Sequence, residues 1–477
     1  MQTSWIENRG VPSNAGSEIA VVNPATEAVI DTIPQGSADD VDAAVAAARK
    51  AQPAWAGLSP VARRNSLRAV ADRMRERLPE LARLLTIENG KPLPQAAGEV
   101  NAAIDMLLSF AELGVHLRSG NQGATEGELM FQHREARGVA ACIVPWNYPL
   151  ATGIGNVIPN LVVGNTVVWK PSEKTPLASR ALVETCFAGL PPGVVNMVLG
   201  DGPNAGERLV RHDGVDVIAF IGSERTGRRI GESCGRLLKK CVLELGGKDP
   251  LIVDETVDVR AAARLAAEAT YANAGQICTS TERLYVQRRI FEPFIEALLR
   301  ESAAIRLGDG MEEGVQMGPL VDHLQLAKVV AHAEDAIRAG AEARCGGRRL
   351  ERRGFFFPPT VLTGIDRKML LMDEETFGPI APVMPFDEFD EAIALANDCR
   401  YGLAAIVCTT SAPRSIKAIQ SLKAGMVKIN TMRGRTAGAT SEPFKASGIG
   451  HGYGIEMLQE LSVQKSVHWR GAPPGSA

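Results

Sequence analysis

Short apolar runs alternate with longer amphipathic stretches along the middle of the chain. The apolar runs have the length of buried strands and fall at 139–144, 165–170, 194–198, 215–221 and 240–243. Helical periodicity occurs between them at 150–162, at 176–187, shortly after Pro203 and at 226–234. Strands that alternate with helices are typical of βαβ units, so the pattern predicts a parallel sheet with helices on both faces.

The same alternation begins again after the glycine pair Gly246-Gly247. Strand-like runs at 251–253 and 284–286 alternate with helical stretches at 259–273 and 291–303. The pattern therefore predicts a second α/β domain, and we expect the domain boundary near Gly246. A chain of 477 residues is also too long for a single hydrophobic core.

The N-terminal third is mostly helical in pattern. Asp39 is the expected N-cap of an alanine-rich helix that runs to about Gln52, a second helix follows Pro60, and a long amphipathic helix covers 95–117. Two stretches do not fit this scheme, namely the polar segment 119–134 and the alternating segment 461–469. Both are compatible with arms that pair outside their own domain, and equally with loops and a frayed tail.

Composition excludes several classes of protein. The net charge is −3, which gives no reason to expect a nucleic-acid partner or an anionic membrane surface, and the apolar runs are far shorter than a membrane helix. Eight cysteines are scattered singly without a Cys-x-x-Cys pair, and there are seven histidines, so neither a disulfide framework nor a metal site is expected. With no secretory signal visible, these features predict a soluble, cytoplasmic enzyme.

Two residues have the sequence context of a catalytic pair. Cys278 lies in Asn-Ala-Gly-Gln-Ile-Cys-Thr-Ser, after a helix and before a strand, where a thiol can be exposed. Glu244 lies at a strand end, in Leu-Glu-Leu-Gly-Gly-Lys. Taken alone, the cysteine could be a small buried hydrophobe and the glutamate a capping or ion-paired carboxylate, because sequence distance does not make them neighbours.

These two motifs and their separation resemble the aldehyde dehydrogenase superfamily, in its NAD(P)-dependent, hydrolytic form. Six further motifs agree in family order, so that the resemblance covers nearly the whole chain. They are Asn23-Pro-Ala-Thr26, Glu88-Asn-Gly-Lys-Pro92, Pro145-Trp-Asn-Tyr-Pro149, Lys170-Pro-Ser-Glu173, Phe220-Ile-Gly-Ser-Glu-Arg-Thr-Gly227 and Glu374-Glu-Thr-Phe-Gly-Pro379.

The resemblance implies a fold with three parts. A Rossmann-like parallel-sheet domain would bind NAD and comprise 1–118 and 135–246, and an α/β catalytic domain would comprise 247–445. A small β flap, from 119–134 and 455–477, would serve oligomerisation, giving a homodimer or a homotetramer.

The resemblance also implies a mechanism for the catalytic residues. Cys278 would attack the aldehyde carbonyl, and the side-chain amide of Asn147 would stabilise the resulting oxyanion. Loss of hydride to the nicotinamide leaves a thioester on the cysteine. Glu244 would then act as the general base for the water that hydrolyses this thioester.

The cofactor residues follow by the same resemblance. Ser223 and the helix that follows it would hold the pyrophosphate. Lys170 and Glu173 would contact the adenosine ribose, and Glu173 would repel a 2′-phosphate, so NAD is favoured over NADP. Glu375 and Phe377 would hold the nicotinamide ribose and ring. The complete expected set is Pro145, Trp146, Lys170, Ser172, Glu173, Gly222, Ser223, Gly227, Leu245, Glu375 and Phe377.

Three positions depart from the common family pattern. Asn156 stands where many members have lysine, Pro443-Phe444 runs directly into Lys445 without an intervening glycine pair, and Gly452 stands where many have glutamate. That glutamate is often part of a proton relay near the base, so its absence leaves open how Glu244 exchanges protons.

The aldehyde itself is not identified by the sequence. Tyr148 is a candidate for the substrate pocket, and Arg433 and Arg435 could bind a substrate carboxylate or be solvated loop charges. A CoA-acylating relative and a non-catalytic nucleotide-binding descendant remain alternatives. Glu244 at the base position argues against the first, and the intact set of Cys278, Asn147 and Glu244 against the second.

Overall fold

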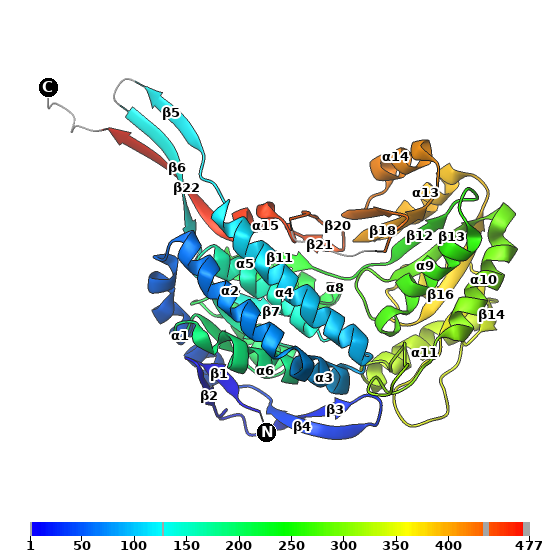
Figure 1. Ribbon diagram of the computed structural model, residues 1–477, viewed down its shortest axis with the longest axis horizontal. Helices are drawn as coiled ribbons and strands as arrows, with labels where there is room; N and C mark the ends of the chain where they lie inside the picture. The colour runs from blue at the N-terminus through cyan, green and yellow to red at the C-terminus, as the bar shows by residue number, and fades with distance from the viewer. Residues whose placement is uncertain (1, 126–127, 433–437, 471–477) are drawn as a thin grey trace.

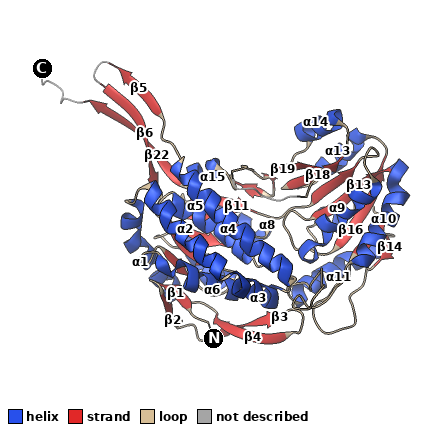
Figure 2. Cartoon of the chain, in the orientation of Figure 1, coloured by secondary structure: helices blue, strands red, loops and turns tan. Residues whose placement is uncertain are grey.

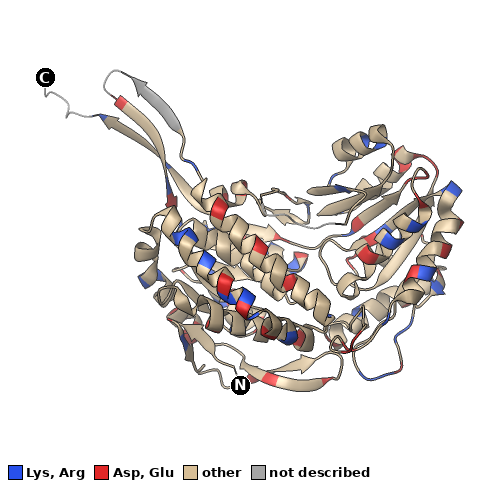
Figure 3. Ribbon diagram, viewed as in Figure 1, with Lys and Arg blue, Asp and Glu red and all other residues tan. Residues whose placement is uncertain are grey.

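The computed structural model describes residues 2–125, 128–432 and 438–470. Two α/β lobes lie side by side, and a β arm projects from one of them (Figure 1). The predicted α/β fold class is confirmed, because both lobes are built on a largely parallel sheet with helices packed on it (Figure 2). Acidic and basic side chains are interspersed over both lobes (Figure 3).

The first lobe contains an eight-stranded sheet in the order β2-β1-β9-β8-β7-β10-β11-β21. Its central strands, from β9 to β11, are parallel, and the strands at both edges are antiparallel. The predicted strands of this region are present, with ends that differ by at most two residues. The strands are β1 (Ser4–Ile6), β2 (Arg9–Val11), β7 (Val139–Ile143), β8 (Thr166–Lys170), β9 (Val195–Met197), β10 (Val217–Ile221), β11 (Lys240–Glu244) and β21 (Gly448–Ile449).

Helices cover both faces of this sheet, because every residue of β7 is buried and successive side chains point to opposite faces. Val139, Ala141 and Ile143 belong to one buried apolar cluster, and Ala140 and Cys142 to another. The helices are α1 (Ala38–Ala56), α2 (Pro60–Glu76), α3 (Leu78–Asn89), α4 (Leu93–Val115), α5 (Pro149–Val162), α6 (Leu177–Cys186), α7 (Glu207–Arg211), α8 (Glu224–Leu237) and α15 (Ile455–Glu460).

The predicted N-cap of α1 is wrong. Ser37, not Asp39, caps the helix, because the Ser37 hydroxyl accepts the N–H of Asp40 at 3.2 Å while the Asp40 carboxylate accepts the N–H of Ser37 at 2.9 Å. This reciprocal pair satisfies two backbone donors, whereas Asp39 would satisfy one at most. The helix also continues to Ala56, beyond the predicted end at Gln52.

The second lobe contains a seven-stranded sheet in the order β14-β15-β16-β13-β12-β18-β19, parallel except for β14. Its strands are β12 (Asp249–Val253), β13 (Thr281–Gln287), β14 (Glu342–Cys345), β15 (Thr360–Thr363), β16 (Ile380–Phe386), β18 (Ala404–Cys408) and β19 (Met426–Ile429). Its helices are α9 (Val259–Tyr271), α10 (Phe291–Ala304), α11 (His323–Arg338), α12 (Leu370–Asp373), α13 (Phe389–Asn397) and α14 (Ala412–Ser421).

The projecting arm is a three-stranded antiparallel sheet in the order β22-β6-β5. It is formed by β5 (Asn121–Thr125), β6 (Glu128–Ala136) and β22 (Ser462–Arg470), so segments more than 300 residues apart lie side by side (Figure 1). Two small antiparallel pairs complete the fold, β3 (Glu18–Asn23) with β4 (Ala28–Pro34) and β17 (Tyr401–Gly402) with β20 (Phe444–Lys445). Among the described residues, no helix is both long and apolar enough to cross a membrane.

Two crossings between the lobes lie close together, and Ser447 joins them. The first crossing connects β11 to β12, and the second connects β20 to β21. The Ser447 hydroxyl donates to the carbonyl of Gly246 at 2.8 Å and accepts the N–H of Gly402 at 2.9 Å, while the Ser447 carbonyl accepts the N–H of Leu245. A fully buried serine therefore fixes the position of the strand end that carries Glu244.

Replacing Ser447 by alanine is expected to lower the free energy of unfolding by about 1–3 kcal/mol, because a buried carbonyl and a buried N–H lose their partner. Urea denaturation would measure this as a lower midpoint. Ser466→Ala, on the exposed part of β22, serves as the control. A midpoint unchanged in both variants would show that the Ser447 hydroxyl does not join the crossings.

Candidate active site

Glu244 and Cys278 meet between the two lobes. Glu244 is the last residue of β11, and Cys278 lies between the short 3₁₀ helix Ala272–Gly275 and β13. The Cys278 thiol donates to Oε1 of Glu244 with an Sγ–Oε1 distance of 3.4 Å, although 34 residues separate them in the chain. A partly exposed thiol beside a carboxylate is the arrangement expected of a nucleophile and a base.

The backbone before Cys278 is held in an unusual conformation. Asn273, Ala274 and Gly275 all have positive φ angles, of 50°, 56° and 73°. Gly275 leaves no room for a side chain, since a Cβ would lie 2.2 Å from the carbonyl oxygen of Gly378. The Gln276 amide group, which accepts the N–H of Val321 and donates to the carbonyl of Asn273, holds the end of this turn. The thiol is thus presented by a segment that packing defines closely.

Asn147 lies beside this segment, in the loop between β7 and α5. Its Nδ2 donates to the carbonyl of Gln276 at 2.9 Å, and its Oδ1 has no donor among the described residues. A side-chain amide carries two N–H groups, so one of them is still available to an oxyanion. The structure brings Asn147, Glu244 and Cys278 together, as the motifs suggested.

A buried ion pair that the sequence reasoning missed supports the Asn147 loop. The Lys91 ammonium is fully buried, pairs with Glu99, donates to the carbonyl of Asn147 at 2.7 Å and lies 3.8 Å from the ring centroid of Tyr148. Glu99 in turn accepts the N–H groups of Leu150 and Ala151 at the start of α5. Lys91 is part of the Glu-Asn-Gly-Lys-Pro motif, but its contact with residue 147 is too distant in sequence to be inferred from spacing.

Tyr148, the candidate substrate residue, is partly buried in this group. Burial, followed by the nearby Glu99 and Cys278, raises the pKa of its hydroxyl. The tyrosine therefore stays neutral and supplies a ring and a hydroxyl rather than a charge. Arg433 and Arg435, the other two candidates, lie outside the described residues.

Several candidate cofactor residues also come together. Trp146 and Phe377 form an edge-to-face pair with ring centroids 5.4 Å apart, and Lys170 pairs with Glu173 at 3.2 Å. The Ser172 hydroxyl accepts the N–H of Lys174. The Lys174 ammonium lies 5.5 Å from the centroid of the Trp146 ring. Pro145, just before that tryptophan, is partly exposed.

The start of α8 has the features of an anion-binding helix terminus. Ser223 is its N-cap, and the N–H of Gly222 donates to the carbonyl of Glu244, so this terminus lies beside the base. Gly227 must be a glycine, because a Cβ there would lie 2.2 Å from the Leu245 side chain. Leu245 therefore packs directly on the first turn of α8.

The loop that carries Glu375 and Phe377 depends on a second buried ion pair that the sequence reasoning missed. Glu282 accepts the N–H groups of Thr376 and Phe377, both at 2.7 Å, and pairs with the buried Lys248 ammonium, which also donates to the Thr376 hydroxyl. These bonds hold Phe377 at a φ of 56°, an uncommon conformation for an aromatic residue.

Glu375 faces the first crossing between the lobes. It accepts the N–H of Gly247 at 3.0 Å, and a Cβ on Gly246 would lie 2.8 Å from its Oε1. Burial, together with the nearby Glu282 charge, raises the pKa of Glu375 to about 7. Within the described residues, no cluster of three or more His, Cys, Asp or Glu side chains is arranged to hold a metal ion.

The raised pKa of Glu375 gives a pH-dependent stability. A carboxyl whose pKa is about 7 in the folded chain and 4.5 ordinarily contributes most to stability below pH 4.5, and that contribution is lost as the pH rises through 7. Glu375→Gln has no carboxyl that can ionise, so its stability does not fall in this way as the pH rises. The melting temperature of Glu375→Gln minus that of the wild type is therefore expected to rise between pH 5 and pH 8. A difference that does not vary with pH would contradict the raised pKa.

Comparison with known proteins gives a consistent result. The model of the aldehyde dehydrogenase family matches residues 11–467. The NADP(+) succinate-semialdehyde dehydrogenase GabD of Escherichia coli is 37% identical over 465 residues, covering 96% of both chains, and the glutarate-semialdehyde dehydrogenase of Pseudomonas putida matches to the same extent.

Solved structures agree with these matches. The crystal structure of lactaldehyde dehydrogenase from Escherichia coli has a TM-score of 0.96 and 35% identity, covering 98% of this chain and 99% of the other. Betaine aldehyde dehydrogenase from Staphylococcus aureus, in complex with NAD+, has a TM-score of 0.96 and 33% identity, covering 99% and 96%. With a thiol and a carboxylate in contact between two lobes of this fold, the chain belongs to the aldehyde dehydrogenase family and is an NAD(P)-dependent aldehyde dehydrogenase.

Proposed function

We propose that this enzyme oxidises an aldehyde to a free carboxylic acid with NAD, through a thiohemiacetal and a thioester on Cys278. The observation that carries the proposal is the 3.4 Å contact between the Cys278 thiol and the Glu244 carboxylate. A carboxylate at this distance can accept the thiol proton as the sulfur attacks the aldehyde carbonyl.

The residues around the expected cofactor position fit a dinucleotide. The N-terminus of α8, capped by Ser223, offers backbone N–H groups to a pyrophosphate, and the glycine pair at 246–247 leaves space beside Glu375 that a side chain would fill. NAD, when bound, accepts the hydride that leaves the substrate carbon. Glu173, Glu375 and Phe377 would hold its riboses and ring, and Pro145, Trp146, Lys170, Ser172, Gly222, Gly227 and Leu245 would complete the site.

Hydrolysis is favoured over transfer to CoA by the position of Glu244. Water is a weak nucleophile and needs a base to cleave a thioester, whereas a thiol needs less assistance. Asn147, fixed by Gln276 and by the Lys91–Glu99 pair, would donate its remaining N–H to the oxyanion at both stages. The carbonyl oxygen develops negative charge as the thiol adds to it, and again as water attacks the thioester.

The preference for NAD rests on Glu173. The relatives of this enzyme differ in their coenzyme, since the GabD protein is named for NADP(+) and the Staphylococcus aureus enzyme was solved with NAD+. A carboxylate accepts hydrogen bonds from two ribose hydroxyls but repels a 2′-phosphate. The ion pair with Lys170 lowers this repulsion without removing it, so we propose a preference for NAD rather than exclusive use of it.

The arm suggests how subunits associate. We propose that 119–134 and 455–477 serve oligomerisation, with 1–118 and 135–246 binding NAD and 247–445 completing catalysis. The arm has a long edge strand, β22, with apolar side chains of Val463 and Trp469 exposed on one of its faces. Of the proposed arm residues, those of α15 pack on the body of the first lobe instead, with Met457 and Leu458 buried.

Rapid kinetics can distinguish the proposed roles of Cys278 and Glu244. Cys278→Ala is expected to abolish aldehyde oxidation while NAD still binds, measured by NADH absorbance and by calorimetry. Glu244→Gln should slow acid release far more than the first turnover of NADH, by about a hundredfold or more. Equal loss in both phases would mean that Glu244 acts mainly on the thiol, and residual turnover in Cys278→Ala would exclude that residue as nucleophile.

The ribose assignment is tested by coenzyme preference. Glu173→Ala is expected to reduce the ratio of kcat/KM for NAD over NADP by about tenfold, because a repulsive charge beside the 2′-position is removed. Glu184→Ala, on the exposed side of α6, provides the control for a lost acidic side chain. A ratio unchanged by Glu173→Ala would remove this residue from the ribose site.

The arm hypothesis is tested by sedimentation velocity. Trp469→Lys should shift the enzyme toward smaller species, because it places a charge on the exposed apolar face of β22. His468→Lys adds the same charge to the opposite face of that strand and should leave the distribution unchanged. Identical distributions for both variants and the wild type would contradict association through this face.

A further inference from the structure

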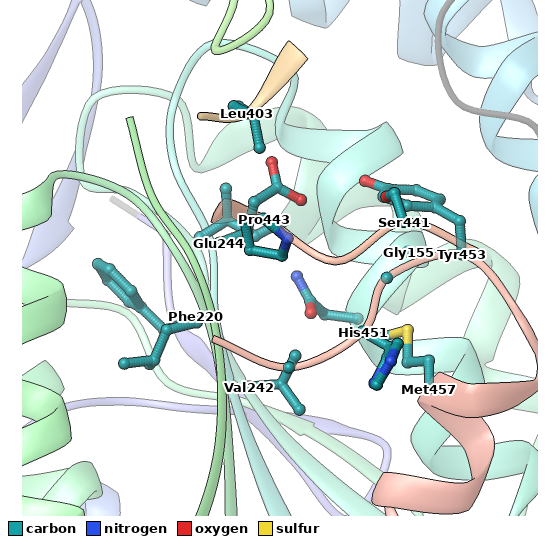
Figure 4. A pocket seen from close by; sticks show the side chains of 15 residues that line it. Gly155, Phe220, Val242, Glu244, Leu403, Ser441, Pro443, His451, Tyr453 and Met457 are labelled. Carbon is teal, nitrogen blue, oxygen red and sulfur yellow. The ribbon is translucent and has the colours of Figure 1, made fainter. Parts of the chain in front are cut away.

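A cavity lies beside Glu244, next to the ends of β10 and β11. The space that the centre of a water molecule can reach in it is about 30 Å³; the cavity is open to solvent and is lined by β10, β11, the middle of α5 and the C-terminal segment that contains residues 441–457 (Figure 4). Glu244 stands at one end of this space, and His451 stands at the other (Figure 4). The Glu244 carboxylate therefore contacts both the thiol and this cavity.

The cavity is large and polar enough to hold water. Asn156, Ser441 and Tyr453 line it and offer an amide and two hydroxyls, while Gly452 adds no side chain. A water needs about 10–15 Å³ of such space and two to four polar partners, so the cavity has room for about two waters. The Asn156 Nδ2 donates to the carbonyl of Thr152 within α5. Because its amide side chain is neutral, Asn156 adds no charge to the cavity.

His451 connects the cavity with the solvent. Its side chain is 29% exposed, its Nδ1 lies 3.3 Å from Oε1 of Glu460, and its Nε2 lies 3.6 Å from Oε2 of Glu442. The backbone N–H of His451 donates to Oε2 of Glu460 at 3.1 Å. The imidazole therefore lies between the carboxylates of Glu442 and Glu460.

Two further charged groups lie near His451. Lys240 on β11 pairs with Glu460 at 3.2 Å, and Glu456 on α15 interacts electrostatically with the imidazole. Burial alone would raise the pKa of Glu460, but the His451 N–H and Lys240 outweigh it and hold that pKa below its usual value. Three carboxylates and one ammonium thus surround the imidazole.

We propose that His451 receives the proton that Glu244 takes from the deacylating water, through water molecules in this cavity, and releases it to the solvent. The proposal rests on the hydrolytic function proposed above. The attacking water forms a C–O bond to the thioester carbonyl carbon and gives one proton to Glu244. The C–S bond breaks and returns the electron pair to Cys278, and the Glu244 proton passes along the cavity waters to the His451 imidazole.

The strand register sets the length of this path. Glu244 pairs with Gly448 and Leu243 with Ile449 in the antiparallel contact between β11 and β21, so His451 lies three residues along from the partner of Glu244. Three residues of chain span at most about 10 Å. The roughly two waters for which the cavity has room would bridge the two side chains.

The first experiment removes the proton acceptor. In weakly buffered solution, His451→Gln should leave the first-turnover burst of NADH unchanged and slow steady-state turnover by about tenfold, with proton release delayed to match. Millimolar imidazole should restore turnover, because a diffusing base replaces the missing side chain. His468→Gln, on the arm, is the matched control and should behave as the wild type does.

The second experiment closes the path while keeping His451. A Cβ on Gly452 meets only Ser441 atoms, at 3.9 and 4.0 Å, and its φ is not positive, so Gly452→Leu is compatible with the backbone and places a side chain at the cavity wall. This variant should also slow steady-state turnover without changing the burst. Imidazole should restore it little, since added base cannot enter a filled cavity.

The outcomes separate the two proposals. Steady-state turnover unaffected by His451→Gln in weak buffer, or a loss that imidazole does not restore, would overturn the role of His451. Wild-type enzyme that forms NADH but releases acid only as a CoA ester would instead contradict the hydrolytic function. Acid release by the wild type with normal turnover in both variants would leave the hydrolytic function intact and exclude this path.

Discussion

The crossing between the two lobes is the constraint on which the site depends. Glu244 ends the last parallel strand of one sheet, and Lys248 lies immediately before the first strand of the other. Only three residues thus separate Glu244 from the lysine whose ammonium holds the Glu375–Phe377 loop. Because a link this short cannot be rearranged independently of the sheets, the distance between base, thiol and nicotinamide loop is set by how the lobes pack.

Two buried ion pairs convert this packing into a defined active site. Lys91–Glu99 holds the Asn147 loop, and Lys248–Glu282 holds the loop of Phe377. A buried pair adds little net stability compared with apolar residues, because desolvation offsets the attraction. Here each pair also bonds to the backbone of a loop. Lys91 donates to the carbonyl of Asn147, and Glu282 accepts the N–H groups of Thr376 and Phe377, so the buried charges are satisfied by the loops that they position. We therefore regard both pairs as positioning elements rather than as sources of stability.

Hydrophobic patterning predicted most of the strands and helices between 139 and 303, but not β1 to β4, α3 or the elements between 304 and 460, and not the contacts between elements. Strand periodicity predicted β7 to β11, since buried parallel strands are continuous apolar runs, and the context of Cys278 and Glu244 identified the pair that meets. The N-cap of α1 was assigned to Asp39 because the reciprocal bonds of Ser37 and Asp40 were not considered. Lys91 and Lys248 were missed because their roles depend on partners in other elements, which local patterns do not specify.

Because the segment after Pro443 is short, residues 443–447 contribute both to the connection between the lobes and to the cavity beside Glu244. Phe444–Lys445 forms a strand with Tyr401–Gly402 directly, and the Lys445 ammonium donates to the carbonyls of Asn397 and Cys399. The chain therefore reaches the crossing at Ser447 within two residues, while Pro443, before the strand, lines the cavity. With glycine at 452 and a neutral asparagine at 156, that cavity contains space for water where a charged side chain would otherwise stand. The proton path proposed above ends at the His451 imidazole, which lies between the Glu442 and Glu460 carboxylates.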